Sequence, residues 1–409
     1  MNKKLQGFTV IALLAALCLQ AATIVTMNRT QRAVGDSLSR FADRLDAFVV
    51  EQNRLAEREA PPKKMSFDPL CSEVPFYETL SLAEGEKVMI LDATSERLLL
   101  NRYYDYHEGD DLFREEGYGS YTSALEIFNV AEQAVVCSIR AAQNAFCTDG
   151  AFLPDGGFAY VTVTPVKNEL SYYTVEVYRE GVSSTVDEGG CYESGFDAPE
   201  VVSLGDGCFA YSYHNSKTNE FGVNVVSARG DVTPQISLRE GASAEHRRTT
   251  LRGYGAAYLY YAAVDGKGTV WVGDSAALTH RFSLPSTERV FEYCFLEDRI
   301  LFMMEVTTSD GAEHCILMKD LDGNNLLRHP CETLYRLETN GKDTVLGIDG
   351  SYSPHSICVT SQGVEIQKLA LPKAPVRFYS TADNAFFLHY DKGAFGSDQG
   401  LHQLLRLTI

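Results

Sequence analysis

The sequence lacks the short motifs that mark several common enzyme classes. It contains no GxSxG, HExxH or GxxxxGK[ST] segment, so serine hydrolases with a nucleophile elbow, HExxH zinc proteases and P-loop nucleotide hydrolases are without their usual signatures. Its nine histidines are scattered, with no pair at metal-ligand spacing. We therefore assign no catalytic residue and predict neither a metal site nor a cofactor.

Positive charge is also scarce. The chain holds 36 Lys and Arg against 55 Asp and Glu, for a net charge of −19. Residues 1–64 hold 10 basic and 6 acidic residues, which leaves −23 on the rest of the chain. Binding nucleic acid requires basic side chains that neutralise phosphates, so we predict no nucleic-acid partner. The negative charge is typical of a soluble exported domain.

Proline and tryptophan are rare, whereas other aromatic residues are plentiful. The 409 residues include 13 Pro and 1 Trp, but 22 Tyr and 21 Phe. Tyr and Phe favour partly buried β-strands, and this composition is unlike that of a disordered chain.

One pattern recurs seven times: an aromatic-rich strand, a polar turn and a second strand. Successive copies start 41 to 60 residues apart. A period of this size, with several short strands in each unit, is typical of a β-propeller. We therefore predict an all-β propeller of seven blades, with six as the alternative. The copies begin at Leu98, Phe158, Phe209, Ala256, Ile300, Thr344 and Ala385.

The last copy is incomplete, because the chain stops at Ile409 within its third strand. A propeller avoids an open sheet edge when the opposite end of the chain supplies the missing strand. We expect the segment 75–82 to be this closing strand.

Two single repeats resemble known families. The segment 316–326, ILMKDLDGNNL, resembles the repeat of TolB-like propellers, and the segment 263–273, AVDGKGTVWVG, resembles a repeat of the propellers in two-component regulators. Each match covers about eleven residues and lies within a single blade. The resemblance implies a propeller over residues 65–409 that binds a protein or a ligand at the bacterial envelope, and it implies no particular activity.

The N-terminal segment predicts a membrane anchor. Two lysines, Lys3 and Lys4, precede an uncharged run at 8–27, which as a helix would span about 30 Å and cross a bilayer. The lysines place the N-terminus in the cytoplasm and the propeller outside. Cleavage of a signal peptide requires small residues at both positions −3 and −1, and the candidate sites in the apolar run each supply only one. This favours an uncleaved, single-pass anchor at residues 1–27 over a cleaved signal peptide. A lipoprotein signal is disfavoured because Leu17 precedes Cys18.

Residues 28–64 predict a helical stalk that ends at Pro61 and Pro62, which cannot continue a helix. Apolar residues recur within it at alternating steps of four and three. This spacing favours a parallel homodimer through residues 34–55, with a single amphipathic helix as the alternative. The apolar positions are Val34, Leu38, Phe41, Leu45, Phe48 and Leu55.

Nine cysteines follow the anchor. Five lie in strand-like segments, where a free cysteine packs as a small apolar residue. Four lie near predicted turns and could pair, although nine is an odd number and no CxxC occurs. These four are Cys71, Cys147, Cys191 and Cys331.

The candidate binding residues come from one set of loops. In a propeller, the hairpins that join the second and third strands of the blades all emerge at one end of the sheets. Exposed aromatic residues among polar ones are typical of a binding surface. The candidates in or beside these loops are Tyr106, His107, Asp110, Asp111, Tyr118, Asn215, Tyr352, His355 and Phe395.

Together these features predict a membrane-anchored, extracytoplasmic propeller without catalytic activity. Its loops would bind an envelope protein or a cell-wall ligand, as a scaffold or a sensor. The alternative is a carbohydrate-active enzyme, or another hydrolase or lyase, with its site in the central channel. Such chemistry needs paired carboxylates or a metal contributed by several blades.

Overall fold

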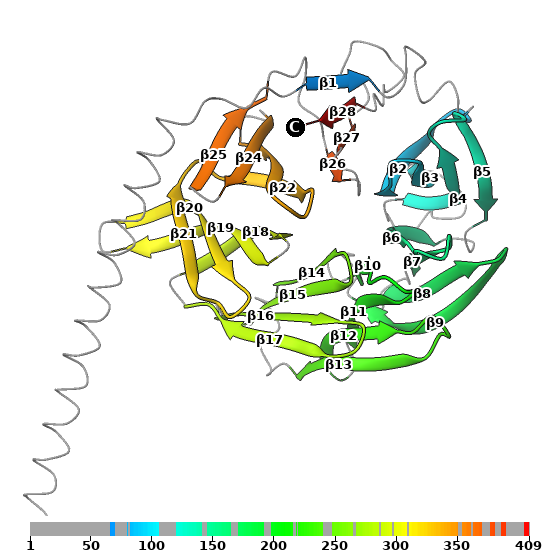
Figure 1. Cartoon of the computed structure of the whole chain (residues 1–409). Coiled ribbons are helices and arrows are strands. Elements are labelled where there is room, and N and C mark those ends of the chain that lie inside the picture. Colours follow the sequence, from blue (N-terminus) through cyan, green and yellow to red (C-terminus); the bar gives the residue numbers. More distant parts are fainter. Residues whose placement is uncertain are drawn as a thin grey trace, which may run out of the picture. The chain divides into compact units, whose positions relative to one another are not determined.

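Antiparallel β-strands make up nearly all of the described part of the chain (Figure 1). The structure is a computed structural model of the 409-residue chain. The residues that it describes are 66–69, 80, 82–105, 120–140, 145–164, 171–191, 198–215, 218, 220–239, 248–264, 267–285, 288–296, 298–308, 311–350, 354–360, 363–369, 377–380, 386–389 and 405–408.

Six sheets each contain four strands that pair in chain order. The first three sheets are β2 (Glu86–Ala93), β3 (Arg97–Asp105), β4 (Ser120–Asn129) and β5 (Ala134–Ile139); β6 (Phe146–Phe152), β7 (Phe158–Thr164), β8 (Ser171–Arg179) and β9 (Val182–Cys191); and β10 (Val201–Ser203), β11 (Phe209–Asn215), β12 (Glu220–Val226) and β13 (Val232–Arg239). The next three are β14 (Arg248–Tyr254), β15 (Ala257–Val264), β16 (Lys267–Asp274) and β17 (Leu278–Ser283); β18 (Glu288–Leu296), β19 (Arg299–Thr308), β20 (Gly311–Asp320) and β21 (Asn325–Pro330); and β22 (Leu334–Thr339), β23 (Thr344–Asp349), β24 (Pro354–Thr360) and β25 (Gly363–Lys368).

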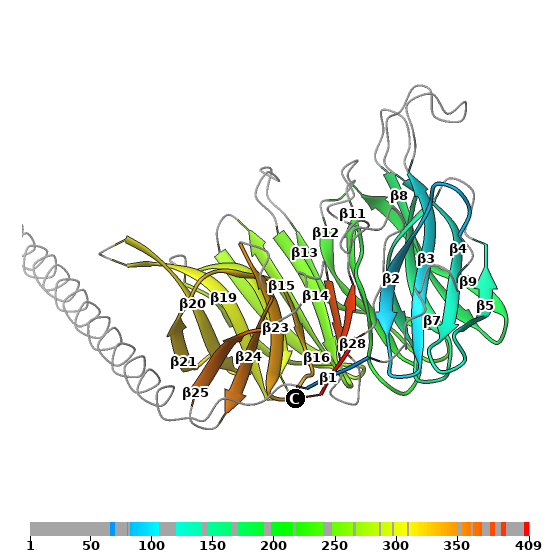
Figure 2. The ribbon, with the colours of Figure 1, turned by 90° about the horizontal axis from the view of Figure 1, so that it is seen from above.

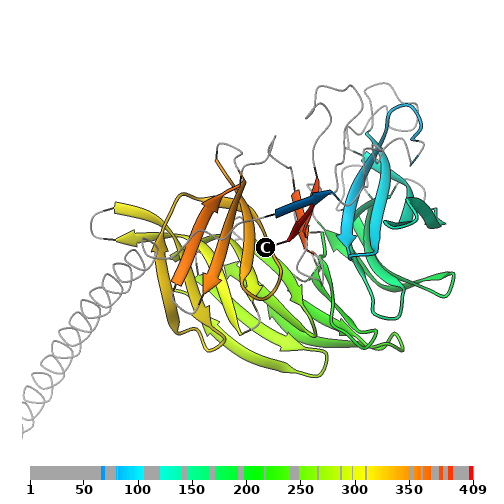
Figure 3. The same ribbon diagram turned by 45° about the horizontal axis from the view of Figure 1, so that its top comes forward.

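Four further strands bring the two ends of the propeller segment together. Strand β26 (Arg377–Ser380) pairs with β27 (Phe386–His389), and β27 contacts β28 (Leu405–Thr408). Strand β28 pairs in turn with β1 (Ser66–Pro69), with Phe67 opposite Leu407 (Figure 3). The prediction that an N-terminal segment supplies the missing strand is confirmed.

The predicted position of that closing strand was wrong, because the pairing segment is Ser66–Pro69 and not 75–82. Most of the segment 75–82 lies outside the described residues. Its described residue Leu80 is buried and packs in a core cluster with Val88 and Tyr379. The apolar side chain of Leu80, which contributed to the strand prediction for 75–82, is thus part of the core.

The first strands of the sheets contact one another in chain order. Each contacts the first strand of the next sheet, and β26 contacts β2 again. Figure 2 shows strands of neighbouring sheets side by side. The contacts therefore return to their starting sheet, as in a propeller.

Several second strands are almost entirely buried. All six residues of β23 are buried, as are the first six of β7, whereas much of the outermost strand β13 is exposed. A strand covered on both faces carries a continuous apolar run, and this explains segments such as FAYVTV.

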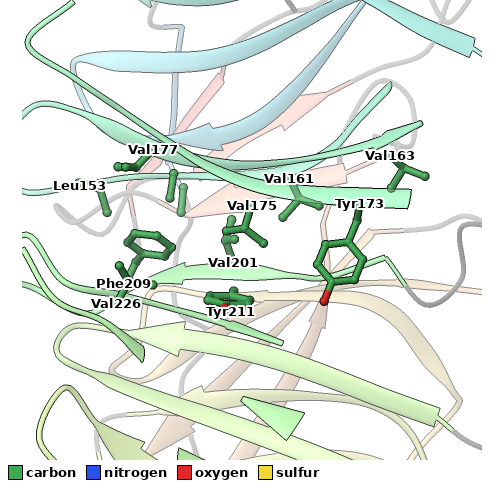
Figure 4. Close-up of a cluster of buried hydrophobic side chains, with 12 residues drawn as sticks. Leu153, Val161, Val163, Tyr173, Val175, Val177, Val201, Phe209, Tyr211 and Val226 are labelled. Atoms are coloured by element: carbon green, nitrogen blue, oxygen red, sulfur yellow. The ribbon is translucent and has the colours of Figure 1, made fainter. Parts of the chain in front are cut away.

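The core consists of layers between neighbouring sheets. Figure 4 shows one layer, in which Val161 and Val175 of one sheet face Val201, Phe209 and Tyr211 of the next. These side chains are at most 5% exposed. Burial at about 25 cal/mol per Å² of apolar surface makes each such layer a large stabilising contribution. Apolar packing between neighbouring sheets is therefore the main contribution to the stability of the fold.

Predicted turns lie where the sequence placed them. Gly156 and Gly323 have φ angles of 92° and 86°, which glycine adopts without steric cost. The turn at Gly323 is held by the carboxylate of Asp320, whose Oδ1 accepts hydrogen bonds from the backbone N–H of Asp322 and Asn324 at 3.0 and 2.8 Å. This segment is therefore a hairpin turn.

The predicted cysteine locations need one correction. Cys147 was predicted to lie near a turn, but it is fully buried inside β6. The prediction was wrong because the strand that precedes the aromatic-rich strand in each sheet was not recognised from the sequence. Burial raises the pKa of its thiol well above the ordinary value. Cys147 and Cys331 are both free, so neither forms a disulfide in this structure.

The predicted membrane anchor at 1–27 and the predicted stalk at 28–64, including the predicted dimer segment 34–55, lie outside the described residues. Among the residues that are described, no helix is both long enough and apolar enough to span a membrane.

The return contact between β26 and β2 includes a hydrogen bond that can be tested. The Tyr379 hydroxyl donates to the buried carbonyl of Ile90 at 2.7 Å. Tyr379→Phe leaves that carbonyl without this donor, so we expect the free energy of unfolding to fall by about 1–2 kcal/mol. Tyr335→Phe is the control, because Tyr335 is 44% exposed. Equal stability of the two variants in urea titrations would contradict the closed contact.

Candidate functional site

A polar cavity of about 1100 Å³ lies among the first strands of the sheets. Residues in or beside β2, β6, β10, β14, β18, β22 and β26 line it. Ligand sites are commonly concave, with a few convergent polar groups. The cavity is therefore the candidate functional site within the described residues.

The cavity reaches one particular end of the sheets. Its lining includes Thr94, Gly255 and Asn340, which lie in turns between first and second strands. We call this end the turn end. Because the second strand runs away from that turn, the hairpins between second and third strands lie at the opposite end, which we call the hairpin end. The cavity and the predicted binding loops are thus associated with different ends.

Five carboxylates line the cavity, and four of them lie immediately after a β-bulge in a first strand. A bulge inserts an extra residue and redirects the side chains that follow. The same irregularity thus recurs at the same place in four sheets. The four are Asp92 in β2, Asp149 in β6, Glu292 in β18 and Glu338 in β22, and the fifth, Glu200, precedes β10.

Four of these carboxylates bind the first strand of the following sheet. In each case one oxygen accepts a hydrogen bond from a backbone N–H of that strand. A hydrogen bond to a charged acceptor is stronger than a neutral one. The pairs are Asp92 Oδ2 with Phe152 N at 2.7 Å, Asp149 Oδ2 with Val201 N at 2.8 Å, Glu200 Oε2 with Leu251 N, and Glu338 Oε1 with Ser380 N at 3.3 Å.

The fourth sheet contributes a cation at the equivalent place. Arg252 in β14 donates from Nη1 to Glu200 Oε1 at 3.1 Å and to the carbonyl of Leu251 at 2.9 Å. The side chains of Arg252 and Glu200 remain 40% and 32% exposed, because they face the cavity. Burial alone would lower the pKa of Arg252, but the charges of Glu200 and other neighbours raise it overall.

Burial raises the pKa of three of the cavity carboxylates, and that of Glu338 is raised despite the hydrogen bonds from Ser380. The pKa of Asp92 is raised to about 6, against an opposing effect of the amides of Phe152 and Ala93. The pKa of Asp149 is raised to about 7 by burial and by the nearby charge of Glu200, against the amide of Val201. Asp92 and Asp149 therefore titrate near neutral pH.

Most of the binding residues that were predicted from the sequence lie outside the residues that the structure describes. Asn215 ends β11, is exposed and accepts a hydrogen bond from Thr218 N at 3.3 Å. His355 in β24 is partly buried, with its Nε2 2.9 Å from Asp349 Oδ2. The two lie on different sheets, so the structure does not assemble them into one cluster. Tyr106, His107, Asp110, Asp111, Tyr118, Tyr352 and Phe395 lie outside the described residues.

The cavity carboxylates were not predicted from the sequence, because the first strands were not recognised there. A signal was present: an acidic residue interrupts each apolar segment shortly before the turn that opens an aromatic-rich strand. The segments are ILDA at 90–93, TDGAF at 148–152, PEVV at 199–202, FEYCF at 291–295 and RLET at 336–339.

The described residues contain no group of three or more His, Cys, Asp or Glu side chains placed to hold a metal ion. The described lining of the cavity offers carboxylates, hydroxyls and the basic side chains of Arg252, Arg336 and Lys342.

We expect Asp149→Asn to stabilise the protein at pH 8. The folded pKa of Asp149, about 7, lies above its ordinary value of 3.8, so the carboxyl's contribution to stability is largest at low pH and is lost as pH rises through 7. The neutral amide avoids that loss and still offers an oxygen to Val201 N–H. The expected gain is about 1 kcal/mol, reduced from the full effect of the shift because the group is partly exposed.

Urea unfolding of wild type and Asp149→Asn at pH 8 and pH 4 provides the measurement. The advantage of the variant should shrink toward pH 4, where the wild-type carboxyl is largely protonated in the folded state. A variant that is less stable than wild type at pH 8 would contradict the raised pKa of Asp149.

Comparisons with known proteins give similar folds at low identity. The Pseudomonas aeruginosa periplasmic gluconolactonase PpgL is 13% identical over 77% of this chain and 99% of that chain, with a TM-score of 0.44. The WD40 β-propeller domain of Doa1 is 10% identical over 84% and 97%, with a TM-score of 0.43. A structure of YCF48 bound to D1 peptide is 11% identical over 80% and 97%, with a TM-score of 0.45.

No model of a protein family and no curated protein matches the sequence. The similar structures are propellers, and at these identities they indicate nothing beyond a fold. The chain is an all-β protein of four-stranded antiparallel sheets with propeller neighbours.

Proposed function

We propose that this protein is a non-catalytic, seven-bladed propeller that binds an envelope protein or a cell-wall ligand through its hairpin end. β26, β27, β28 and β1 form the seventh blade in this proposal, supported by the contact between β27 and β28 and the return contact of β26 with β2. The single-blade resemblances to TolB-like and regulator-type propellers are consistent with a binding role.

The observation that carries the proposal is the position of the two longest hairpin connections. They span 106–119, between β3 and β4, and 390–404, between β27 and β28. The other connections between second and third strands are no longer than 165–170. The two long ones belong to sheets whose first strands, β2 and β26, are in contact. Long connections on a rigid scaffold commonly carry function.

The cavity supports the binding role over an enzyme. The alternative of a hydrolase or lyase in the channel requires carboxylates that are free to exchange protons with a substrate. Four of the five cavity carboxylates are instead hydrogen-bonded to the backbone of the next sheet. These bonds give the carboxylates a structural role.

Residues 8–27 would hold the protein in the membrane as an uncleaved single-pass anchor, with the propeller outside the cytoplasm. Lys3 and Lys4 precede this anchor, which favours a cytoplasmic N-terminus, and the propeller that follows is acidic. A parallel homodimer through residues 34–55 would present two hairpin ends together.

We expect partner binding to require the long connections. Replacing 107–118, or 391–400, with a short Gly-Ser linker should abolish specific capture in a crosslinking pull-down from intact cells. Arg229→Ser is the control, because Arg229 is exposed in a turn at the turn end. Unfolding in urea should remain cooperative in all variants.

The control must capture the same protein as wild type. Capture that survives both replacements would contradict the assignment of the binding surface to the hairpin end.

A further inference from the structure

Glu292 differs from the other carboxylates of the cavity. It is partly buried and lines the cavity from β18. Among the described residues its side chain makes no hydrogen bond, although its four counterparts each bind the next sheet. The structural role that explains those four therefore does not explain Glu292.

A second open acceptor lies on the neighbouring strand. Glu338 uses Oε1 for both the N–H and the hydroxyl of Ser380, at 3.3 and 2.8 Å, and the described residues provide no hydrogen bond to its Oε2. Strands β18 and β22, which carry Glu292 and Glu338, are in contact. The cavity wall thus offers carboxylate oxygens from two adjacent strands.

The charges of the cavity favour a cation. Five carboxylates face three basic residues, Arg252, Arg336 and Lys342. Arg252 contributes attraction toward Glu292, but its Nη1 is already bonded to Glu200 and to a backbone carbonyl. Ionised carboxylates surrounded by protein are stabilised by a nearby opposite charge. The cavity is therefore short of positive charge.

The shape and lining indicate the kind of cation. A volume of about 1100 Å³ has room for an organic molecule. Quaternary ammonium groups are typically held by exposed aromatic faces, but the aromatic lining residues Phe378 and Tyr379 are only 4% and 8% exposed. A primary ammonium has three N–H donors, which suit carboxylate and hydroxyl acceptors.

We propose that the cavity binds a small organic cation through a primary ammonium group held by Glu292 and Glu338. This site is associated with the turn end and is independent of the partner proposed for the hairpin end. The propeller would then combine a ligand site with a separate partner surface.

The test is calorimetric titration of the purified full-length chain with 1,4-diaminobutane at pH 8. We expect binding to wild type and an affinity about tenfold weaker for Glu292→Gln, because a charge-assisted hydrogen bond is lost. Asp149→Asn is the matched control: it removes the same charge from the same cavity, and its amide oxygen can still accept the hydrogen bond from Val201 N. It should weaken binding much less.

Three results would overturn the proposal. They are no binding of the diamine at millimolar concentration, an equal loss in Glu292→Gln and Asp149→Asn, and equally tight binding of uncharged 1,4-butanediol. An equal loss would mean that the cavity attracts cations only by its overall charge. Glu292→Gln should still unfold cooperatively, since it loses the attraction of Arg252 but no hydrogen bond among the described residues.

The outcome is separable from that of the proposed function. A chain with 107–118 replaced should lose its protein partner and still bind the diamine. If the diamine site fails while partner capture depends on the long connections, only the cavity proposal is wrong.

Discussion

Four pairs of neighbouring sheets are joined by a hydrogen bond between a carboxylate of one sheet and a backbone N–H of the next. A sheet in this protein has its second strand covered on both faces, so it cannot be stable without neighbours. Apolar layers supply most of the attraction, but they do not by themselves fix the distance between first strands. The bonds from Asp92 to Phe152 and from Asp149 to Val201 join first strands directly, beside the polar cavity that both carboxylates line.

This arrangement separates two roles within the molecule. Carboxylates that bind the scaffold are poorly suited to catalysis, so acidic residues around a central cavity are not in themselves a sign of an enzyme. Glu292 is the exception, because the scaffold does not use it. In the proposed function, recognition falls to the hairpin end, where the connections between second and third strands differ in length.

Much of the fold could be predicted from the sequence. Aromatic runs such as FAYVTV marked the second strands because those strands are buried on both faces, and glycines such as Gly156 marked turns that need a positive φ. The first strands were missed because they are short and irregular and face a polar cavity, so they lack a clear apolar period. The carboxylates on them were missed for the same reason. Register across sheets, such as Asp92 with Phe152, joins residues far apart in the chain, and local patterns do not encode it.

Amide hydrogen exchange in wild type and Asp92→Ala shows whether the carboxylates hold neighbouring sheets together. If they do, the N–H groups of Phe152 and Val201 exchange slowly in wild type. Asp92→Ala should then accelerate exchange at Phe152 much more than at Val201, whose acceptor is Asp149. Rapid exchange at both amides in wild type, or an equal change at both in the variant, would contradict this role of the carboxylates.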